Sequence, residues 1–300
     1  MEVNYELYHG DCLDWMPTVP DGSIDAIISD PPYPEIDRDY GRMTESAWMD
    51  MMQEVVRQAR RILKTTGSAV FILQPNSEKV GKMRLWLWEF MVWAGKEWNI
   101  VQDAYWWNIA AQPTVHTQRV HGLMRNSVKM SVWIGNDRCY RNQDAVVWAE
   151  STHNLAQRLS GRCDNTKSPS GHSANRSRML QSAEIRGGVT PFNLLPLANT
   201  GSRTSAGANC HGAGTPLKLA DWWTRYICPP GGTVCDPFAG SGTMGIAALN
   251  NGCNFIGYEK MSVHYETACY RLNHLANENS AEPVRIEGKE TDTLDLPLFA

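Results

Sequence analysis

Residues 233–245 have the sequence Thr-Val-Cys-Asp-Pro-Phe-Ala-Gly-Ser-Gly-Thr-Met-Gly. An apolar, β-prone run comes first, and the pattern G-x-G-x-x-G begins at Gly240 and leads into a helix-forming segment. Glycines at such a turn allow a tight reversal and a close approach of the backbone to a ligand. An acid, Glu259, ends the next predicted strand and can bind ribose hydroxyls. The stretch therefore predicts an α/β unit that binds a nucleoside-containing cofactor.

The residues just before the glycine turn discriminate between two classes of cofactor. A dinucleotide such as NAD would place its pyrophosphate at the glycine turn and the helix start, where the carboxylate of Asp236 is unfavourable. S-Adenosylmethionine has no phosphate, and its ammonium and sulfonium groups are attracted by a carboxylate. Asp236 therefore favours the methyl donor, and a nicotinamide-dependent oxidoreductase is the alternative.

A second acid follows a predicted strand near the start of the chain. Residues 23–29 form an apolar, β-prone run that stops at Asp30-Pro31-Pro32-Tyr33, since proline cannot donate to a strand ladder. The exocyclic amine of adenine or cytosine is a poor nucleophile, and the Asp30 carboxylate and Pro31 carbonyl would accept its hydrogens and localise its lone pair. Tyr33 offers a face on which an extruded base can stack. The sequence has no Pro-Cys dipeptide, which disfavours thiolate chemistry at cytosine C5.

Strands and helices alternate along most of the chain, which predicts a mostly parallel sheet with helices on both faces. The predicted strands are Ser23–Ser29, Ser68–Leu73, Ile100–Trp107, Val128–Ile134, Thr233–Cys235 and Phe255–Tyr258. The predicted helices are Ala47–Leu63, Ser77–Ala94, Leu217–Ile227, Gly242–Asn250 and Ser262–Leu275. The tryptophan-rich part of the second helix and the strand after it are expected to be core or to face another subunit.

The alternation breaks between about residues 150 and 210, where Ser, Asn, Gly, Thr and Arg dominate. Seven basic side chains against Asp164 and Glu184 make residues 151–210 a local +5 in a chain of net charge −4. A basic segment in an acidic body predicts a local contact with phosphate groups. The candidate DNA contacts are Arg158, Arg162, Lys167, Arg176 and Arg178.

The remaining composition excludes several classes of protein. No apolar run approaches the roughly 18 residues of a membrane span, and the first residues do not resemble a signal peptide, so we expect a cytoplasmic protein. The eight cysteines form no Cys-x-x-Cys pair, which favours free thiols over disulfides or zinc ligands. The histidines show no metal-binding spacing, so no metal site is expected.

Together the two acidic blocks resemble those of the β-class amino-group DNA methyltransferases, which place DPPY before the target-recognition region and DPFxGSG after it. The resemblance covers roughly residues 5–140 and 211–275. It implies a Rossmann-like methyltransferase fold with circularly permuted motif order, S-adenosylmethionine as methyl donor and double-stranded DNA as partner. Dimers are common in this class, so a homodimer is a further hypothesis.

The same resemblance implies roles for single residues. In the element Tyr8-His9-Gly10-Asp11-Cys12, Asp11 would meet the adenine amine of the donor and the Cys12 backbone its ring edge. The donor pocket would be completed by Asp236, Pro237, Phe238, Gly240, Ser241, Gly242, Thr243 and Glu259. Thr215 stands where the family has a lysine, and its hydroxyl would donate to the donor's carboxylate in place of that lysine.

The target base is inferred from Asp30. Family members that act on cytosine N4 commonly carry serine at this position, so Asp30 favours adenine N6, with cytosine N4 as the alternative. A catalytically silent DNA-binding regulator is disfavoured because Asp30 and Tyr33 are both intact. The recognition sequence cannot be derived from these patterns.

Four segments follow from this assignment. Residues 1–149 form a catalytic half, 150–210 a target-recognition insertion, 211–276 a cofactor-binding half and 277–300 a C-terminal tail. Residues 293–299 of the tail resemble the short apolar peptides that dock on the bacterial replication sliding clamp, which predicts that clamp as a second partner.

Overall fold

The computed structural model describes residues 3–38, 41–112, 119–149, 183–199 and 214–280. The five predicted DNA contacts between Arg158 and Arg178 lie outside the described residues, and so do the predicted clamp-binding residues 293–299. These assignments stay predictions.

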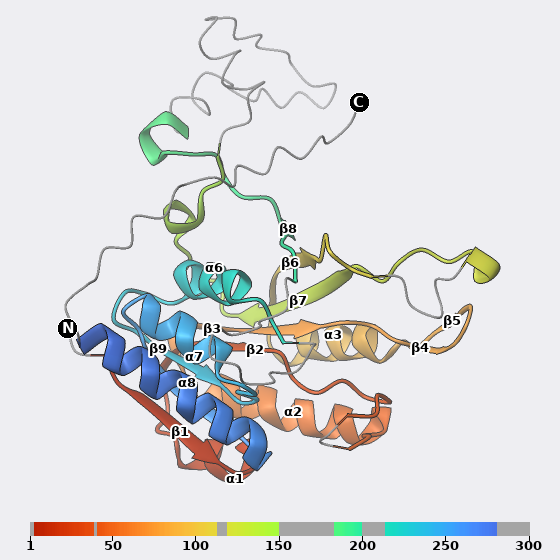
Figure 1. Cartoon of the computed structure of the whole chain (residues 1–300), viewed down its shortest axis with the longest axis horizontal. Helices are drawn as coiled ribbons and strands as arrows, with labels where there is room; N and C mark the ends of the chain where they lie inside the picture. Colours follow the sequence, from red (N-terminus) through yellow and green to blue (C-terminus); the bar gives the residue numbers. More distant parts are fainter. Residues whose placement is uncertain (1–2, 39–40, 113–118, 150–182, 200–213, 281–300) are drawn as a thin grey trace, which may run out of the picture.

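One eight-stranded sheet forms the centre of the molecule (Figure 1). Its order is β1-β10-β9-β2-β3-β7-β6-β8. The five strands from β1 to β3 are parallel to one another, β7 is antiparallel to both of its neighbours, and β8 is parallel to β6. In chain order the strands are β1 Tyr5–His9, β2 Ile24–Ser29, β3 Leu63–Leu73, β6 Ile100–Trp107, β7 Val128–Gly135, β8 Leu194–Pro196, β9 Thr233–Asp236 and β10 Asn254–Glu259. The prediction of a mostly parallel sheet is confirmed.

Helices cover both faces of this sheet (Figure 1). One face carries α1 Cys12–Trp15, α2 Glu45–Ile62 and α3 Trp86–Glu97. The other carries α6 Leu217–Ile227, α7 Thr243–Asn250 and α8 Ser262–Ser280. Alternate strand residues face opposite sides, so Ile28 joins the core beneath α6 and α7, and Ile27 joins the core beneath α2. This two-layered core holds the strand ends in place.

The helix predicted over Ser77–Ala94 is wrong in its first half. The chain forms a short hairpin of β4 Ser77–Lys79 and β5 Lys82–Met83, and α3 begins only at Trp86. Gly81 at the hairpin turn has φ +77°, a left-handed conformation that ends a right-handed helix and that glycine adopts at little cost. The Trp86 indole then donates to Asn76 Oδ1 at 3.0 Å, which positions the start of the helix.

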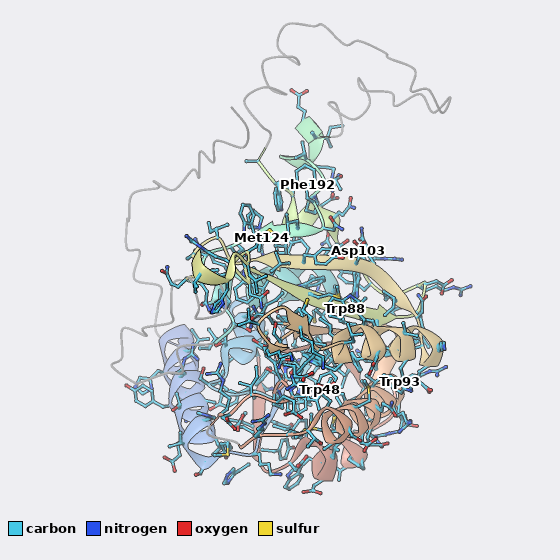
Figure 2. All side chains as sticks on the ribbon, turned by 90° about the vertical axis from the view of Figure 1, so that its right-hand side faces the viewer. Trp48, Trp88, Trp93, Asp103, Met124 and Phe192 are labelled. Carbon is cyan, nitrogen blue, oxygen red and sulfur yellow. The ribbon has the colours of Figure 1, made fainter. Side chains whose placement is uncertain are left out.

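Tryptophans form much of the core, and Trp86 and Trp106 of the tryptophan-rich segment belong to it, whereas Trp88 of that segment is exposed. Trp48 lies inside the domain (Figure 2). The centroid of its ring is 4.6 Å from that of Trp86 and 5.3 Å from that of Phe90. The fully buried tryptophans among the described residues are Trp48, Trp86, Trp106, Trp133 and Trp223. These five buried rings are therefore not accessible to a DNA base.

In the described part of the chain, no helix combines the length and the apolar character that crossing a membrane requires.

Candidate functional site

Four carboxylates stand side by side at one edge of the sheet. Asp11 follows β1, Glu259 ends β10, Asp236 ends β9 and Asp30 follows β2, and these four strands are consecutive and parallel. The carboxyl ends of parallel strands lie at the same edge, and neighbouring strands are about 4.8 Å apart, so the row spans roughly 14 Å. Residues from the first and last parts of the chain thus lie at one edge of the sheet.

Asp236 is the most enclosed member of this row, with 2% of its surface exposed. Its Oδ1 accepts from Ser29 Oγ at 2.5 Å and from the Phe238 amide at 3.0 Å. Burial raises the pKa of Asp236 to about 7, against these two hydrogen bonds and with the help of the negative charges of Glu259 and Asp30. A carboxyl in these surroundings favours a cationic ligand, because a positive charge would stabilise its ionised form.

The glycine turn wraps around Glu259. Glu259 Oε2 accepts from the Gly240 amide at 2.8 Å, and Oε1 accepts from the Met261 amide at 2.7 Å. Gly240 and Gly242 have φ +52° and +80°, and a Cβ on Gly242 would lie 3.1 Å from that of Ala268. Glycine is therefore required by backbone conformation at both positions and by the approach of α8 at Gly242. The predicted ribose-binding acid and the predicted turn are in contact.

Arg271 of α8 holds the hydroxyls of Ser241 and Thr243. Arg271 Nη1 donates to Ser241 Oγ at 2.8 Å and to Thr243 Oγ1 at 3.3 Å. Phe238 and Pro237 fall between Asp236 and Gly240, and the Phe238 ring packs against the core beneath α2. The structure therefore brings the whole predicted DPFxGSG block to one strand end.

Asp11 begins α1 and caps it, since its Oδ1 accepts from the Leu13 amide at 3.0 Å. Its Oδ2 accepts from Lys260 Nζ at 3.1 Å. Partial burial raises the pKa of Asp11, but the Leu13 amide and the Lys260 ammonium outweigh it and the net pKa is lowered. Cys12 is buried, and burial raises the pKa of its thiol, so it is not a thiolate.

The Asp30 carboxylate accepts three hydrogen bonds from described residues. Tyr33 Oη donates to Oδ1 at 2.5 Å, while Thr215 Oγ1 and Lys129 Nζ donate to Oδ2 at 2.6 and 3.2 Å. Thr215, predicted at the donor's carboxylate, is thus in contact with Asp30. The pair Lys129 and Asp30 forms a salt bridge in which only 13% of the Lys129 side chain is exposed.

The Pro31-Pro32-Tyr33 turn is braced from the α2 and α3 side. The Trp48 indole donates to the Pro32 carbonyl at 2.6 Å, and Asn76 Nδ2 donates to the Pro34 carbonyl at 2.7 Å. The Tyr33 hydroxyl is also 3.3 Å from the Ile72 carbonyl. These contacts orient the turn, so Asp30 and the face of Tyr33 are fixed relative to the sheet.

Sequence reasoning missed Ser29 and Lys129. Ser29 is fully buried. Its hydroxyl donates to Asp236 and so links that acid to β2, the strand that Asp30 follows. Lys129 lies in a strand that is otherwise mostly apolar, and a single lysine in such a strand was the available signal. Its proximity to Asp30 depends on the pairing of β7 with β3, which the sequence does not specify.

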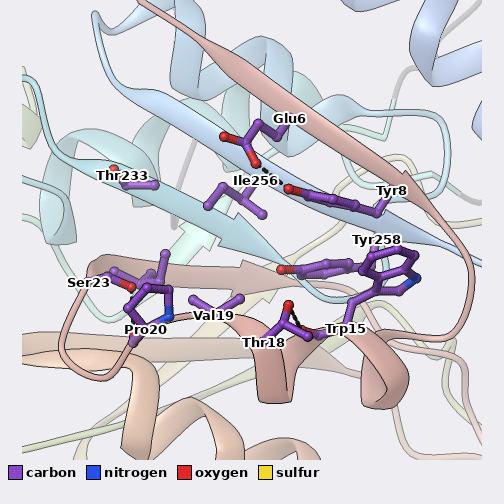
Figure 3. Close-up of a pocket in the computed structure, with 11 residues that line it drawn as sticks. Glu6, Tyr8, Trp15, Thr18, Val19, Pro20, Ser23, Thr233, Ile256 and Tyr258 are labelled. Atoms are coloured by element: carbon purple, nitrogen blue, oxygen red, sulfur yellow. Dashed lines mark hydrogen bonds between the residues drawn. The ribbon is translucent and has the colours of Figure 1, made fainter.

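A cavity of about 320 Å³ is lined by residues of β1, β10 and the segment between α1 and β2 (Figure 3). Its lining includes Glu6, Tyr8, Trp15 and Tyr258, together with Ser23 and Thr233 at the starts of β2 and β9. None of the four acids lines this cavity. Within the described ranges, no three or more His, Cys, Asp or Glu side chains are arranged so that they could hold a metal ion.

Comparisons with known proteins agree with this geometry. The family model described as DNA methylase matches residues 24–269. The type II methyltransferase M.PvuII of Proteus hauseri is 24% identical over 298 residues, which cover 92% of this chain and 86% of that protein. The DNA adenine methyltransferase YhdJ of Escherichia coli K12 is 24% identical over 293 residues, which cover 96% and 89%.

Solved structures show the same fold. The PvuII DNA methyltransferase, described as cytosine-N4-specific, superimposes with a TM-score of 0.67 at 18% identity, covering 93% of each chain. A DNA modification methylase of Thermus thermophilus, TTHA0409, in complex with S-adenosyl-L-methionine, has a TM-score of 0.57 at 18% identity and covers 91% of this chain and 96% of its own.

Proposed function

The chain belongs to the DNA methylase family, and from that premise we propose that it transfers a methyl group from S-adenosylmethionine to the N6 amine of an adenine extruded from double-stranded DNA. One observation carries the proposal. Ser29, next to Asp30, donates to Asp236 at 2.5 Å, so the acid proposed to hold the base and the acid proposed to hold the donor are separated by a single residue. This spacing suits a direct transfer between two adjacent ligands.

The donor half of the site is proposed to consist of Asp11, Asp236 and Glu259. Asp236 would attract the positive charge of the donor, because its buried carboxyl has no basic partner among the described residues. Glu259 has both oxygens oriented by backbone amides and would accept from ribose hydroxyls. S-Adenosylmethionine supplies a methyl group bound to a cationic sulfur, which makes that methyl electrophilic.

The acceptor half is proposed to consist of Asp30, Pro31 and Tyr33. The Asp30 carboxylate and the Pro31 carbonyl would accept hydrogen bonds from the two N–H groups of the amine. These hydrogen bonds would localise the nitrogen lone pair toward the methyl group. Trp48 fixes the double-proline turn through the Pro32 carbonyl. The base would stack on Tyr33, whose hydroxyl is held by Asp30.

Adenine is proposed over cytosine because Asp30 occupies the position at which cytosine-N4 enzymes of this class commonly carry serine. A carboxylate is the stronger acceptor, and three donors already hold this one in place. Cytosine N4 is the second candidate, favoured by the likeness to the PvuII enzyme, which is described as cytosine-N4-specific.

Sequencing of base modifications in a host that expresses the chain tests the target directly. We expect N6-methyladenine at one short sequence motif that is unmodified in the host with an empty vector. The same measurement identifies the recognition sequence and distinguishes adenine from cytosine.

N4-methylcytosine at the motif would favour the second candidate. Absence of any new modified base would overturn methyl transfer and favour a silent DNA-binding regulator. Binding of NAD, with no binding of S-adenosylmethionine, would support the oxidoreductase alternative.

Target recognition is proposed for the segment 150–210, through phosphate contacts of Arg158, Arg162, Lys167, Arg176 and Arg178. We also propose that residues 1–149 and 211–276 form the two halves of the methyltransferase domain around this segment, and that the tail, residues 277–300, docks on a sliding clamp.

A homodimer is proposed on the apolar row of α3. Leu85, Trp88 and Val92 lie at helical spacing with 59%, 40% and 59% of their surfaces exposed. We expect light scattering at micromolar concentration to give twice the 33.7 kDa of one chain, and Trp88→Glu to give a single chain. The control Val263→Glu, on the exposed side of α8, should stay dimeric. A monomer for the wild-type protein with and without DNA would contradict the proposal.

A further inference from the structure

Lys129 is the basic residue closest to the Asp30 carboxylate among the described residues. It is the second residue of β7 and is paired in register with Trp106 of β6. Its Nζ lies 3.2 Å from Asp30 Oδ2, 5.2 Å from the centre of the Tyr33 ring and 5.0 Å from the centre of the Trp106 ring. The ammonium is therefore enclosed by one carboxylate and two aromatic rings.

Such a placement is uncommon for a lysine. Only 13% of the Lys129 side chain is exposed, whereas lysine ammonium groups are almost always in water unless they are paired. The alternation of strand residues directs Lys129 to the same side as Ser131 and Trp133, which are buried beneath α6. The sheet itself thus directs this cation to the acceptor half of the site.

The ammonium occupies the position that the proposed function gives to the target base. It donates to Asp30, as the base amine would, and it lies over the ring of Tyr33, on which the base would stack. A carboxylate offers about four lone-pair positions, and the described residues already use three of them. Thr215 makes the shorter contact with Oδ2, at 2.6 Å, so the longer and more flexible Lys129 contact is the one that an arriving amine displaces.

After displacement the ammonium needs another acceptor close by. In both adenine and cytosine, a ring nitrogen with a free lone pair is adjacent to the carbon that bears the amine. An acceptor at Asp30 and a donor at Lys129 are complementary to this pair of atoms. Guanine and thymine present a carbonyl and an N–H at the corresponding edge, which reverses the pattern.

We propose that Lys129 determines which bases bind in the acceptor half of the site. In the free enzyme its ammonium occupies the place of the base. When the base enters, the ammonium donates a hydrogen bond to the ring nitrogen adjacent to the methylated amine. This inference rests on the proposed function, because it assumes that Asp30 receives the amine. It adds a donor to the proposed acceptors, and the two together fit an amine beside a ring nitrogen and reject an edge with a carbonyl beside an N–H.

The test replaces one atom of the base and one residue of the enzyme together. The substrates are DNA duplexes with the methylated motif, containing either adenine or 1-deazaadenine at the target; 3-deazacytosine serves if the target is cytosine. The variants are Lys129→Met, which retains the length of the side chain without its charge, and Lys129→Arg, which retains donors. Lys96→Met makes the same chemical change on the exposed side of α3 and is the matched control.

We expect the wild-type enzyme to lose at least about tenfold more kcat/KM than Lys129→Met when the ring nitrogen is removed, since a hydrogen bond to a charged donor is lost only in the former. Changes in intrinsic reactivity of the deaza base cancel in this comparison. Lys129→Arg and Lys96→Met should retain the wild-type discrimination, and all variants should bind S-adenosylmethionine as the wild type does.

An equal loss in wild type and Lys129→Met would overturn the role of Lys129 while leaving methyl transfer intact. If Lys129→Met has no measurable activity, the outcome is decided by Lys129→Arg: loss of discrimination in that variant overturns the role. Failure of the wild-type enzyme to methylate any DNA would overturn the proposed function and the role of Lys129 with it.

Discussion

Replacing Asp30 by alanine is expected to lower kcat for methyl transfer by on the order of 10³-fold, the scale of removing a group that stabilises charge in a transition state. In the wild-type enzyme, the carboxylate would accept a hydrogen bond from the amine as the nitrogen becomes tetrahedral. Binding of S-adenosylmethionine, measured by calorimetry, should be retained, because Asp30 belongs to the acceptor half of the site and the donor half is held by Asp236 and Glu259.

Two further variants make this result specific. Asp30→Asn keeps the size of the side chain and one acceptor oxygen, so its kcat should fall between those of the wild type and Asp30→Ala. Asp50→Ala, on the exposed side of α2, should behave as the wild type. Wild-type activity in Asp30→Ala, or an equal loss of donor binding and catalysis, would contradict the assignment.

Asp236→Asn is expected to weaken S-adenosylmethionine binding by on the order of 10²-fold, since a buried carboxylate facing a cation is replaced by a neutral amide. The amide oxygen can still accept from Ser29 and from the Phe238 amide, so the glycine turn should keep its conformation. Calorimetric titration of the two proteins with the donor measures the difference.

The same substitution should stabilise the ligand-free protein at alkaline pH. The folded state raises the pKa of Asp236 from 3.8 to about 7, mainly through burial, so between these values the folded protein holds a proton that the unfolded chain has lost. The contribution of Asp236 to stability is therefore fully present below pH 3.8 and is lost as the pH rises to about 7. At about 1.4 kcal/mol per pH unit, the loss is on the order of 4 kcal/mol above that pH.

Thermal unfolding of wild type and Asp236→Asn at several pH values tests this prediction. The variant should have the higher Tm at pH 8, and the difference should shrink toward pH 4. Donor affinity of the wild type should rise with pH up to about 7 and then level off, whereas that of the variant should not show this rise. A lower Tm for the variant at pH 8 would contradict the burial of an isolated carboxyl.

Much of the framework follows from local sequence patterns. Strand β2 was predicted from an apolar run that ends at a double proline, and β9 from an apolar run that ends at an acid and a glycine turn. Helix α6 begins and ends where its 3.6-residue periodicity predicted. These elements share a property: the residues that determine them are adjacent in the chain, so propensity and periodicity are sufficient.

One helix boundary was predicted wrongly, and one contact lay outside what such patterns report. The helix predicted to begin at Ser77 begins at Trp86, because Gly81 reverses the chain and Asn76 holds the Trp86 indole. Thr215 also contacts Asp30, 185 positions away in sequence, and its predicted contact with the donor's carboxylate stays a prediction. Contacts of this kind depend on how distant segments pack, which periodicity does not report.

The sequence by itself determined the chemistry of this protein: an acid and a rigid double-proline turn at one strand end, and an acid and a glycine turn at another. Only the tertiary structure decided how those ends cooperate. The strand order β1-β10-β9-β2 places the acids in one row, the Ser29 hydroxyl joins two of them, and the antiparallel pairing of β7 with β3 brings Lys129 to Asp30. The physical reason is that strand order and register arise from the packing of both helical layers on the sheet, a property of the whole chain that no short stretch of residues specifies.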